Sequence, residues 1–127
     1  MVGLIDFHQS EQLRRQNRLL TKADFDRVFA AAEFRFSRPP FLLLAASNPT
    51  SSGRIGTVVS KKVAGTAVNR NRIRRVIKES FRQRCHEGKI DIVVVARPPA
   101  RDAVNSDLFV TLEAMWSALA KKRWKQL

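Results

Sequence analysis

The pattern of apolar and polar positions first becomes regular at Thr21. Thr21 and Asp24 have the spacing of a capping box, in which each side chain accepts a hydrogen bond from the backbone of the other residue. Phe25 and Phe29 follow four residues apart, which places them on one side of a helix. The pattern therefore predicts a short helix over residues 22–32.

Three later runs have the composition of strands. Residues 41–46 are continuously apolar, residues 54–60 are rich in Ile, Thr and Val, and residues 90–96 are mostly β-branched. Because residues 47–53 form a turn-rich sequence between the first two runs, we expect those runs to pair as one hairpin. The third run ends before Pro98 and is typical of a strand buried on both faces.

Two longer helices are predicted in the second half of the chain. Helical spacing begins after Gly65 and continues to about His86. A final helix, capped by Asn105 or Ser106, runs through Leu119. On a helical wheel, the side of the long helix that we expect to be buried contains Ile73, Val76, Ile77, Ser80 and Phe81.

Length and charge bound the kind of protein. The chain has 127 residues, 44% of them hydrophobic, which suits one compact domain with a core. Residues 1–18 lack clean periodicity and are basic, so we expect a mobile N-terminal arm before a single domain over residues 19–127. Lys and Arg number 24 against 11 acidic residues, a formal net charge of +13. A domain this basic attracts phosphate, so a polyanionic partner is expected.

Much of this charge lies on the long helix. Glu79 is the one acid between Lys61 and Arg84, so pairing within the helix cannot neutralise its cations. Such a face can simply be solvated, but the density of charge and the preference for Arg, whose planar fork binds phosphate and stacks on bases, favour structured RNA. The side opposite the apolar sector carries Asn71, Arg74, Arg75, Lys78 and Arg82, with Arg72 near its edge.

Other kinds of chemistry find little support in the sequence. The single cysteine, Cys85, excludes an internal disulfide, and His8 and His86 have no second ligand at metal-binding spacing, so no metal site is predicted. No Gly-rich phosphate loop, paired catalytic carboxylates or nucleophile with a base is present, so we expect no catalytic residue and no small-molecule substrate. Without a signal peptide or a long apolar run, we expect a cytoplasmic protein that does not contact membranes.

Several stretches of the chain form a characteristic combination. They are Asn17-Arg18-Leu19, Phe25-Asp26-Arg27-Val28-Phe29, Gly56-Thr57-Val58-Val59-Ser60-Lys61-Lys62, Ala67-Val68-Asn69-Arg70-Asn71-Arg72-Ile73-Arg74-Arg75 and Asp91-Ile92-Val93-Val94-Val95-Ala96-Arg97-Pro98. From Arg14 to Pro98 the chain thus resembles the bacterial ribonuclease P protein family, whose RNR motif matches positions 70–72.

The resemblance implies an α/β (α+β) fold in a single domain. This would be a sandwich of an approximately four-stranded mixed sheet and three helices, arranged like the second domain of ribosomal protein S5. The basic helix would cross between parallel strands in the left-handed sense, whereas physical considerations alone predict a right-handed crossover.

The resemblance also implies a function. The chain would be the protein subunit of ribonuclease P, an endoribonuclease that removes the 5′ leader of precursor tRNA, with the active site in the catalytic RNA and Mg²⁺ held mainly by RNA. The residues assigned to the surface facing the catalytic RNA are Arg70, Asn71, Arg72, Arg74, Arg75 and Lys78. Those assigned to a cleft for the leader, between the first helix and the open sheet face, are Phe25, Phe29, Leu42, Leu44, Val58, Ser60, Lys61 and Lys62.

Alternatives stay open at this point. Phe25 and Phe29 also have the spacing of an ordinary core pair, and relatives often have an aromatic residue where this chain has Leu44. A ribosomal or RNA-assembly protein without a catalytic role would carry the same basic helix. A protein-only nuclease is disfavoured because no carboxylate cluster is evident. Cleavage of precursor tRNA at low Mg²⁺, with the catalytic RNA present, distinguishes these functions.

Overall fold

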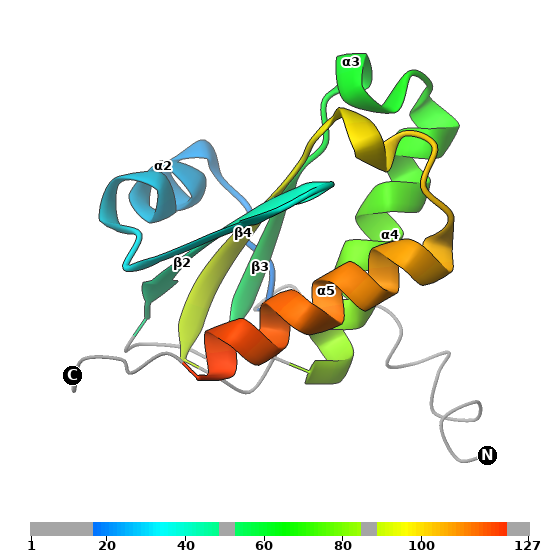
Figure 1. The fold of residues 1–127 in the computed structure, drawn as a ribbon. Helices are drawn as coiled ribbons and strands as arrows, with labels where there is room; N and C mark the ends of the chain where they lie inside the picture. The colour runs from blue at the N-terminus through cyan, green and yellow to red at the C-terminus, as the bar shows by residue number, and fades with distance from the viewer. Residues whose placement is uncertain (1–16, 49–52, 85–88, 122–127) are drawn as a thin grey trace, which may run out of the picture.

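A single mixed sheet forms the centre of the computed structural model, which describes residues 17–48, 53–84 and 89–121 (Figure 1). The strands are β1 (Phe34–Arg38), β2 (Phe41–Ser47), β3 (Arg54–Val58) and β4 (Ile90–Ala96), in the spatial order β1-β2-β4-β3. β2 is antiparallel to both of its neighbours, β1 and β4, whereas β3 and β4 are parallel. The predicted mixed sheet of about four strands is confirmed.

The predicted hairpin between residues 41–46 and 54–60 is wrong. β4 lies between β2 and β3, and β2 forms its hairpin with β1 across Pro39-Pro40. A turn sequence shows where the chain bends but does not decide which strands become neighbours, and a strand as apolar as β4 is most stable inside the sheet. β1 was missed although Phe34 and Phe36 alternate with polar residues, which is the period of a half-buried strand.

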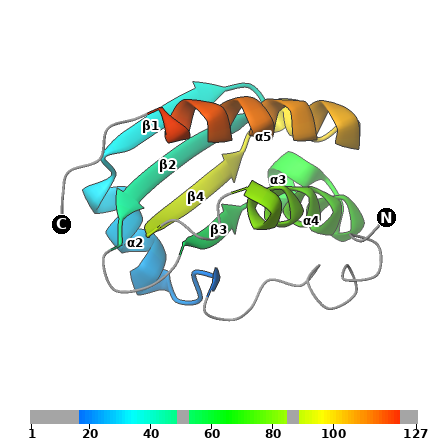
Figure 2. The ribbon, with the colours of Figure 1, turned by 90° about the horizontal axis from the view of Figure 1, so that it is seen from below.

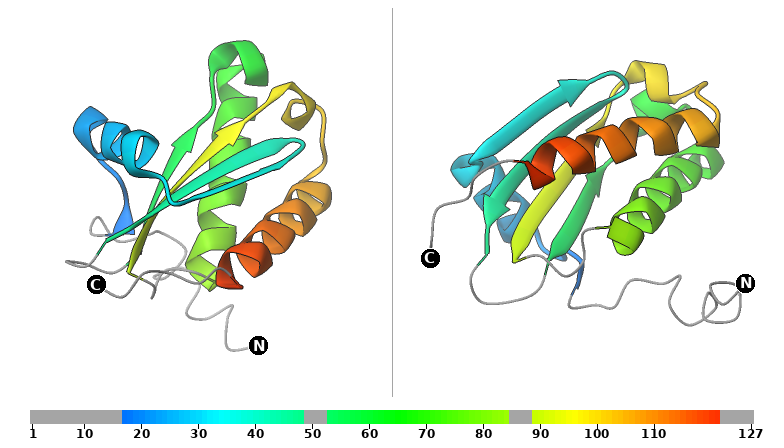
Figure 3. Two further views of the ribbon diagram at one scale, coloured as in Figure 1. Left: turned by 60° about the vertical axis from the view of Figure 1, so that its left-hand side comes forward. Right: turned by 60° about the horizontal axis from the view of Figure 1, so that its bottom comes forward.

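Helices cover both faces of the sheet (Figure 1, Figure 2 and Figure 3). α2 (Lys22–Ala31) lies on one face, and α4 (Ala67–Arg84) and α5 (Asn105–Ala120) pack against each other on the other face. The short helices α3 (Lys61–Ala64) and η2 (Pro98–Ala100) contact each other near the start of α4. The α+β sandwich is confirmed for the described residues, which add α3 and η2 to the three longer helices that were predicted.

Local backbone chemistry sets the ends of the helices. In the predicted capping box, Thr21 Oγ1 accepts from the Asp24 N–H at 3.1 Å and Asp24 Oδ2 accepts from the Thr21 N–H at 3.2 Å. Gly65 separates α3 from α4 with a φ of 87°, a conformation that favours a residue without Cβ. The side-chain cap predicted for the last helix is wrong, because Val104 is its N-cap residue and makes no such bond.

Two apolar clusters, one on each face of the sheet, form the core. The larger cluster includes Phe81 and Trp116, whose rings meet edge to face with centroids 6.2 Å apart. The predicted buried side of α4 is confirmed, and Ser80 belongs to it because its Oγ accepts from Trp116 Nε1 at 2.7 Å. The smaller cluster, under α2, contains the buried residues Leu19, Val28, Leu44 and Val93.

Candidate nucleic-acid interface

Three cations lie one turn apart along α4: Arg70, Arg74 and Lys78. Their four-residue spacing makes them a stripe beside the buried side of the helix. Arg70 is fixed in place because its Nε donates to the Val59 carbonyl at 2.8 Å, at the end of β3. Asn71 and Arg75 form the next stripe and are exposed. One side of α4 therefore carries all the predicted RNA-contacting residues except Arg72.

The structure adds Arg18 to this surface. Although Arg18 was assigned to the N-terminal arm, it forms a β-bridge with Ile55, and the following residue, Leu19, donates its N–H to the Ile55 carbonyl at 3.0 Å. The preceding Asn17 donates from Nδ2 to the Gly53 carbonyl at 2.8 Å. Asn17 and Arg18 thus lie against β3, while residues 1–16 of the predicted arm lie outside the described residues. Sequence reasoning missed Arg18 because no periodicity marks it.

Like charges are crowded on this surface. Burial lowers the pKa of Lys78, and the nearby charges of Arg18 and Arg74 lower that pKa further. Burial and the charge of Arg70 lower the pKa of Arg74 in the same way. The Nε of Arg18 is buried and has no hydrogen-bond partner among the residues that the structure describes. An anion placed here would stabilise the charged forms of these side chains and supply the missing acceptor.

Arg72 turns away from the other predicted RNA contacts. Its Nε donates to Asn69 Oδ1 at 2.8 Å, and its Nη1 donates to Asn105 Oδ1 at 2.7 Å. Its Nη2 lies 3.4 Å from the Ala100 carbonyl and 3.3 Å from the Arg101 carbonyl. These contacts hold the start of α4 to the segment between η2 and α5. They give Arg72 an internal structural role.

This role predicts a difference between two arginines of the same helix. Arg72→Ala should lower the free energy of unfolding by about 1 to 3 kcal/mol, because it removes the hydrogen bonds that the charged guanidinium makes to Asn69, Asn105 and the Ala100 carbonyl. Arg75→Ala removes the same charge from an exposed position and should change that free energy by less than about 0.5 kcal/mol. Urea denaturation measures both values. Equal values for the two variants would contradict a structural role for Arg72.

The second candidate surface lies on the face of the sheet that α2 covers only in part. Leu44 and Gly56 both pair with Val93, and this row is buried beneath α2. The neighbouring row, which we call the open strip, consists of the half-buried residues Leu42, Val95 and Val58. Leu44 is only 1% exposed and therefore supports α2. Leu42 and Val58, which the resemblance assigned to the leader cleft together with Leu44, lie in the half-buried open strip.

The two phenylalanines of α2 differ in their surroundings. The ring of Phe25 lies against β3, since a Cβ added to Gly56 would be 2.5 Å from its Cε2. Phe29 is 47% exposed. The core interpretation of the aromatic pair therefore applies to Phe25, while the ring of Phe29 is about half exposed on α2.

Polar residues follow the end of β3 next to the open strip. Ser60 Oγ accepts from the Val63 N–H at 3.0 Å and so caps α3. Lys61 and Lys62 are exposed in that helix. The capping bond gives Ser60 a local structural role, and the two lysines supply positive charge at this end of the sheet.

The described residues show neither of two other kinds of site. They contain no group of three His, Cys, Asp or Glu side chains that could hold a metal ion. None of their helices is long and apolar enough to cross a membrane. His8, Cys85 and His86, for which no metal-binding role was predicted, lie outside the residues that the structure describes.

Comparison with known sequences points to one family. Residues 13–120 match the family model described as ribonuclease P. The ribonuclease P protein component of Chromohalobacter salexigens is 41% identical over 113 residues, which cover 88% of each chain. That of Nitrosococcus oceani is 42% identical over 106 residues, covering 83% of this chain and 88% of the relative.

Solved structures agree with the sequence relatives. The RNase P protein of Staphylococcus aureus superposes with a TM-score of 0.73 at 34% identity, covering 83% of this chain and 95% of that one. The RNase P protein of Thermotoga maritima superposes with a TM-score of 0.69 at 26% identity, covering 80% and 96% of the two chains. Family model, relatives and fold all coincide over most of the molecule, and the chain belongs to the ribonuclease P protein family.

Proposed function

We propose that this chain acts in the cytoplasm as the protein subunit of ribonuclease P and holds two RNAs at once. The cationic side of α4 would bind the catalytic RNA, and the open strip with Phe29 would bind the 5′ leader of precursor tRNA. Family membership supports the subunit role, because the relatives are protein components of ribonuclease P, an endoribonuclease of tRNA 5′ maturation.

The observation that carries the proposal is the crowded cationic surface formed by Arg18, Arg70, Arg74 and Lys78. Within the described part of the chain none of these side chains forms an ion pair. The pKa of Lys78 and that of Arg74 are lowered first by burial and then by the neighbouring positive charges. Backbone phosphates of a folded RNA would neutralise this surface and release counterions.

The leader surface has the properties that a variable single strand requires. Phe29 offers a ring face that can stack on any base, and the open strip is apolar. The charges of Lys61 and Lys62 would attract the backbone at the end of the strip. No element of this surface demands a particular base, which suits leaders of different sequence.

In the proposed holoenzyme, Mg²⁺ is bound mainly by RNA. The ion prefers phosphate and water oxygens, and the described residues offer no three-ligand cluster for it. We therefore assign its ligands, and the chemistry of hydrolysis, mainly to the catalytic RNA. The protein would help by holding phosphates in place and reducing their repulsion.

Reconstitution tests this proposal. The protein is mixed with the catalytic RNA, and cleavage of precursor tRNA is measured at low Mg²⁺ with and without the protein. We expect the protein to promote cleavage and to be inactive without the RNA. Binding of the catalytic RNA without any effect on cleavage would favour an RNA-assembly protein. Cleavage by the protein alone would indicate a protein nuclease.

A further inference from the structure

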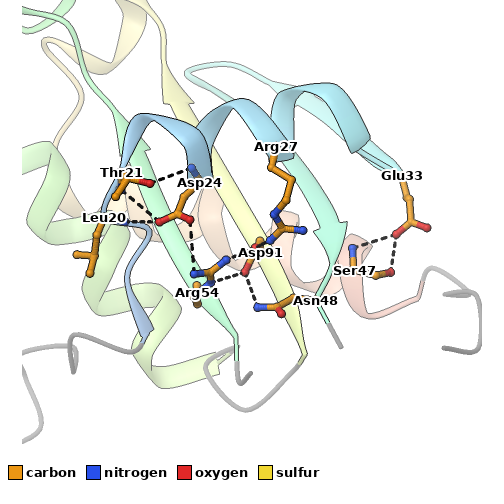
Figure 4. Close-up of polar contacts among 9 residues, drawn as sticks. All are labelled: Leu20, Thr21, Asp24, Arg27, Glu33, Ser47, Asn48, Arg54 and Asp91. Atoms are coloured by element: carbon orange, nitrogen blue, oxygen red, sulfur yellow. Dashed lines mark hydrogen bonds and ion pairs between the residues drawn. The ribbon is translucent and has the colours of Figure 1, made fainter. Parts of the chain in front are cut away.

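An ionic cluster around one buried carboxylate fastens α2 to the sheet (Figure 4). At its centre is Asp91 of β4, whose side chain has 0% exposure. Arg54 of β3 contacts both carboxylate oxygens, Nε to Oδ1 at 2.9 Å and Nη2 to Oδ2 at 2.7 Å. Asn48 donates from Nδ2 to Oδ1 at 2.8 Å. From α2, Arg27 donates to Oδ2 through its Nη2.

The Arg27 bond differs from the others in what it joins. Arg54 lies in β3 and Asn48 directly follows β2, so their bonds pair the buried carboxylate with partners at the sheet itself. Asp91 would keep these partners without Arg27. The particular consequence of the Arg27 bond is therefore to hold the middle of α2 against the sheet.

Further polar contacts fasten the two ends of α2. Near its start, Asp24 Oδ1 lies 3.8 Å from Arg54 Nη1. Just beyond its end, Glu33 Oε1 accepts from the Ser47 N–H at 3.0 Å. Figure 4 shows these contacts along the helix together with the Arg27 contact. α2 is thus fixed by charged and hydrogen-bonded groups over its whole length.

The opposite flank of α2 carries the predicted leader contacts. Residues two apart on a helix are about 200° apart around its axis, so Phe29 points away from Arg27. Phe25, on the same flank as Phe29, rests its ring on Gly56. A helix fixed by ionic bonds on one flank and supported by a ring on the other has a defined roll.

We propose that the Arg27–Asp91 contact is a latch that fixes the roll of α2 and thereby the position of Phe29 relative to the open strip, so that a single-stranded nucleotide of the leader can stack on Phe29. This inference rests on the proposed function. Arg27 and Asp91 are positioning residues: Asp91 is buried, and Arg27 faces the flank opposite Phe29. Neither side chain needs to touch the leader.

The test compares Arg27→Met with Lys22→Met. Lys22 is a matched control, because it is on the same helix and pairs with Asp26 at 2.8 Å, but it is 88% exposed. In the reconstituted holoenzyme, the preference for precursor over mature tRNA is measured across a range of salt concentrations. Hydrogen exchange of residues 22–31 is measured in the free protein. Arg27→Met should reduce the preference by about 10-fold, the effect of losing one base stack.

The other readouts separate a latch from its alternatives. With Arg27→Met, the rate of hydrogen exchange in α2 should increase, and the salt dependence of precursor tRNA binding should stay as in the unsubstituted protein. Lys22→Met should change neither quantity. A salt slope reduced by about one unit would make Arg27 a direct phosphate contact and overturn the proposal. Faster exchange with an unchanged preference, or no change in either, would overturn it as well.

Asp91→Asn tests the same contact by changing the acceptor in place of the donor. A buried residue cannot contact RNA directly, so a loss of leader preference in this variant, with folding intact, supports positioning. If Asp91→Asn does not fold, the Arg27→Met variant still tests whether this contact positions α2 for the leader. Should the unsubstituted holoenzyme show no preference for precursor tRNA, the proposed function fails with this inference, while the exchange data still report whether Arg27 holds α2.

Discussion

Phe29→Ala should weaken the binding of precursor tRNA to the holoenzyme by roughly 5- to 150-fold, the loss of about 1 to 3 kcal/mol of stacking on one base. Binding of mature tRNA, which has no leader, should be unchanged. Since Phe29 is 47% exposed, its removal creates no internal cavity, and the free energy of unfolding should change by less than about 1 kcal/mol. Equilibrium binding of both tRNAs and urea denaturation measure these effects.

Two further variants act as controls for Phe29. Val110→Ala trims an apolar side chain that is 69% exposed on α5, across the sheet from the open strip, and should change neither binding nor stability. Phe25→Ala removes a ring that packs on Gly56 and should lower stability by up to about 3 kcal/mol. Equal loss of precursor and mature tRNA binding with Phe29→Ala would contradict a leader contact.

Removing three charges from α4 should have the largest effect on affinity for the catalytic RNA. For the combined substitution Arg74→Met, Arg75→Met and Lys78→Met, the slope of log affinity against log salt should decrease by about 2 to 3, because each contacted phosphate releases about one counterion. At low salt, affinity should fall by several orders of magnitude if all three side chains contact phosphates.

The matched control removes three charges elsewhere on the protein. Lys22, Lys89 and Lys121 are exposed and lie outside α4, so their replacement by Met gives the same net charge. This variant should keep a slope within about one unit of the unsubstituted protein. Equal slope changes in the two triple variants would indicate general attraction instead of a defined docking surface.

Different signals in the sequence identified different site residues. The stripe of Arg74 and Lys78 beside the buried side of α4 follows from helical periodicity, because positions within one helix have fixed relative angles. The resemblance, not the periodicity, assigned Phe29 and Leu42 to one surface. Asp91 carried an unused signal, since a lone acid in an apolar strand must find buried partners.

The sequence by itself determined the three longer helices, the capping box, the buried side of α4 and the excess of positive charge, because these depend on residues near one another in the chain or on total composition. The tertiary structure alone decided that β4 separates β2 from β3, that Arg18 lies near Lys78 of α4, that Arg72 bonds to the start of α5 and that Arg27 reaches Asp91. These contacts join residues far apart in the sequence. Which of them form depends on the packing of whole elements, and no local pattern records that choice.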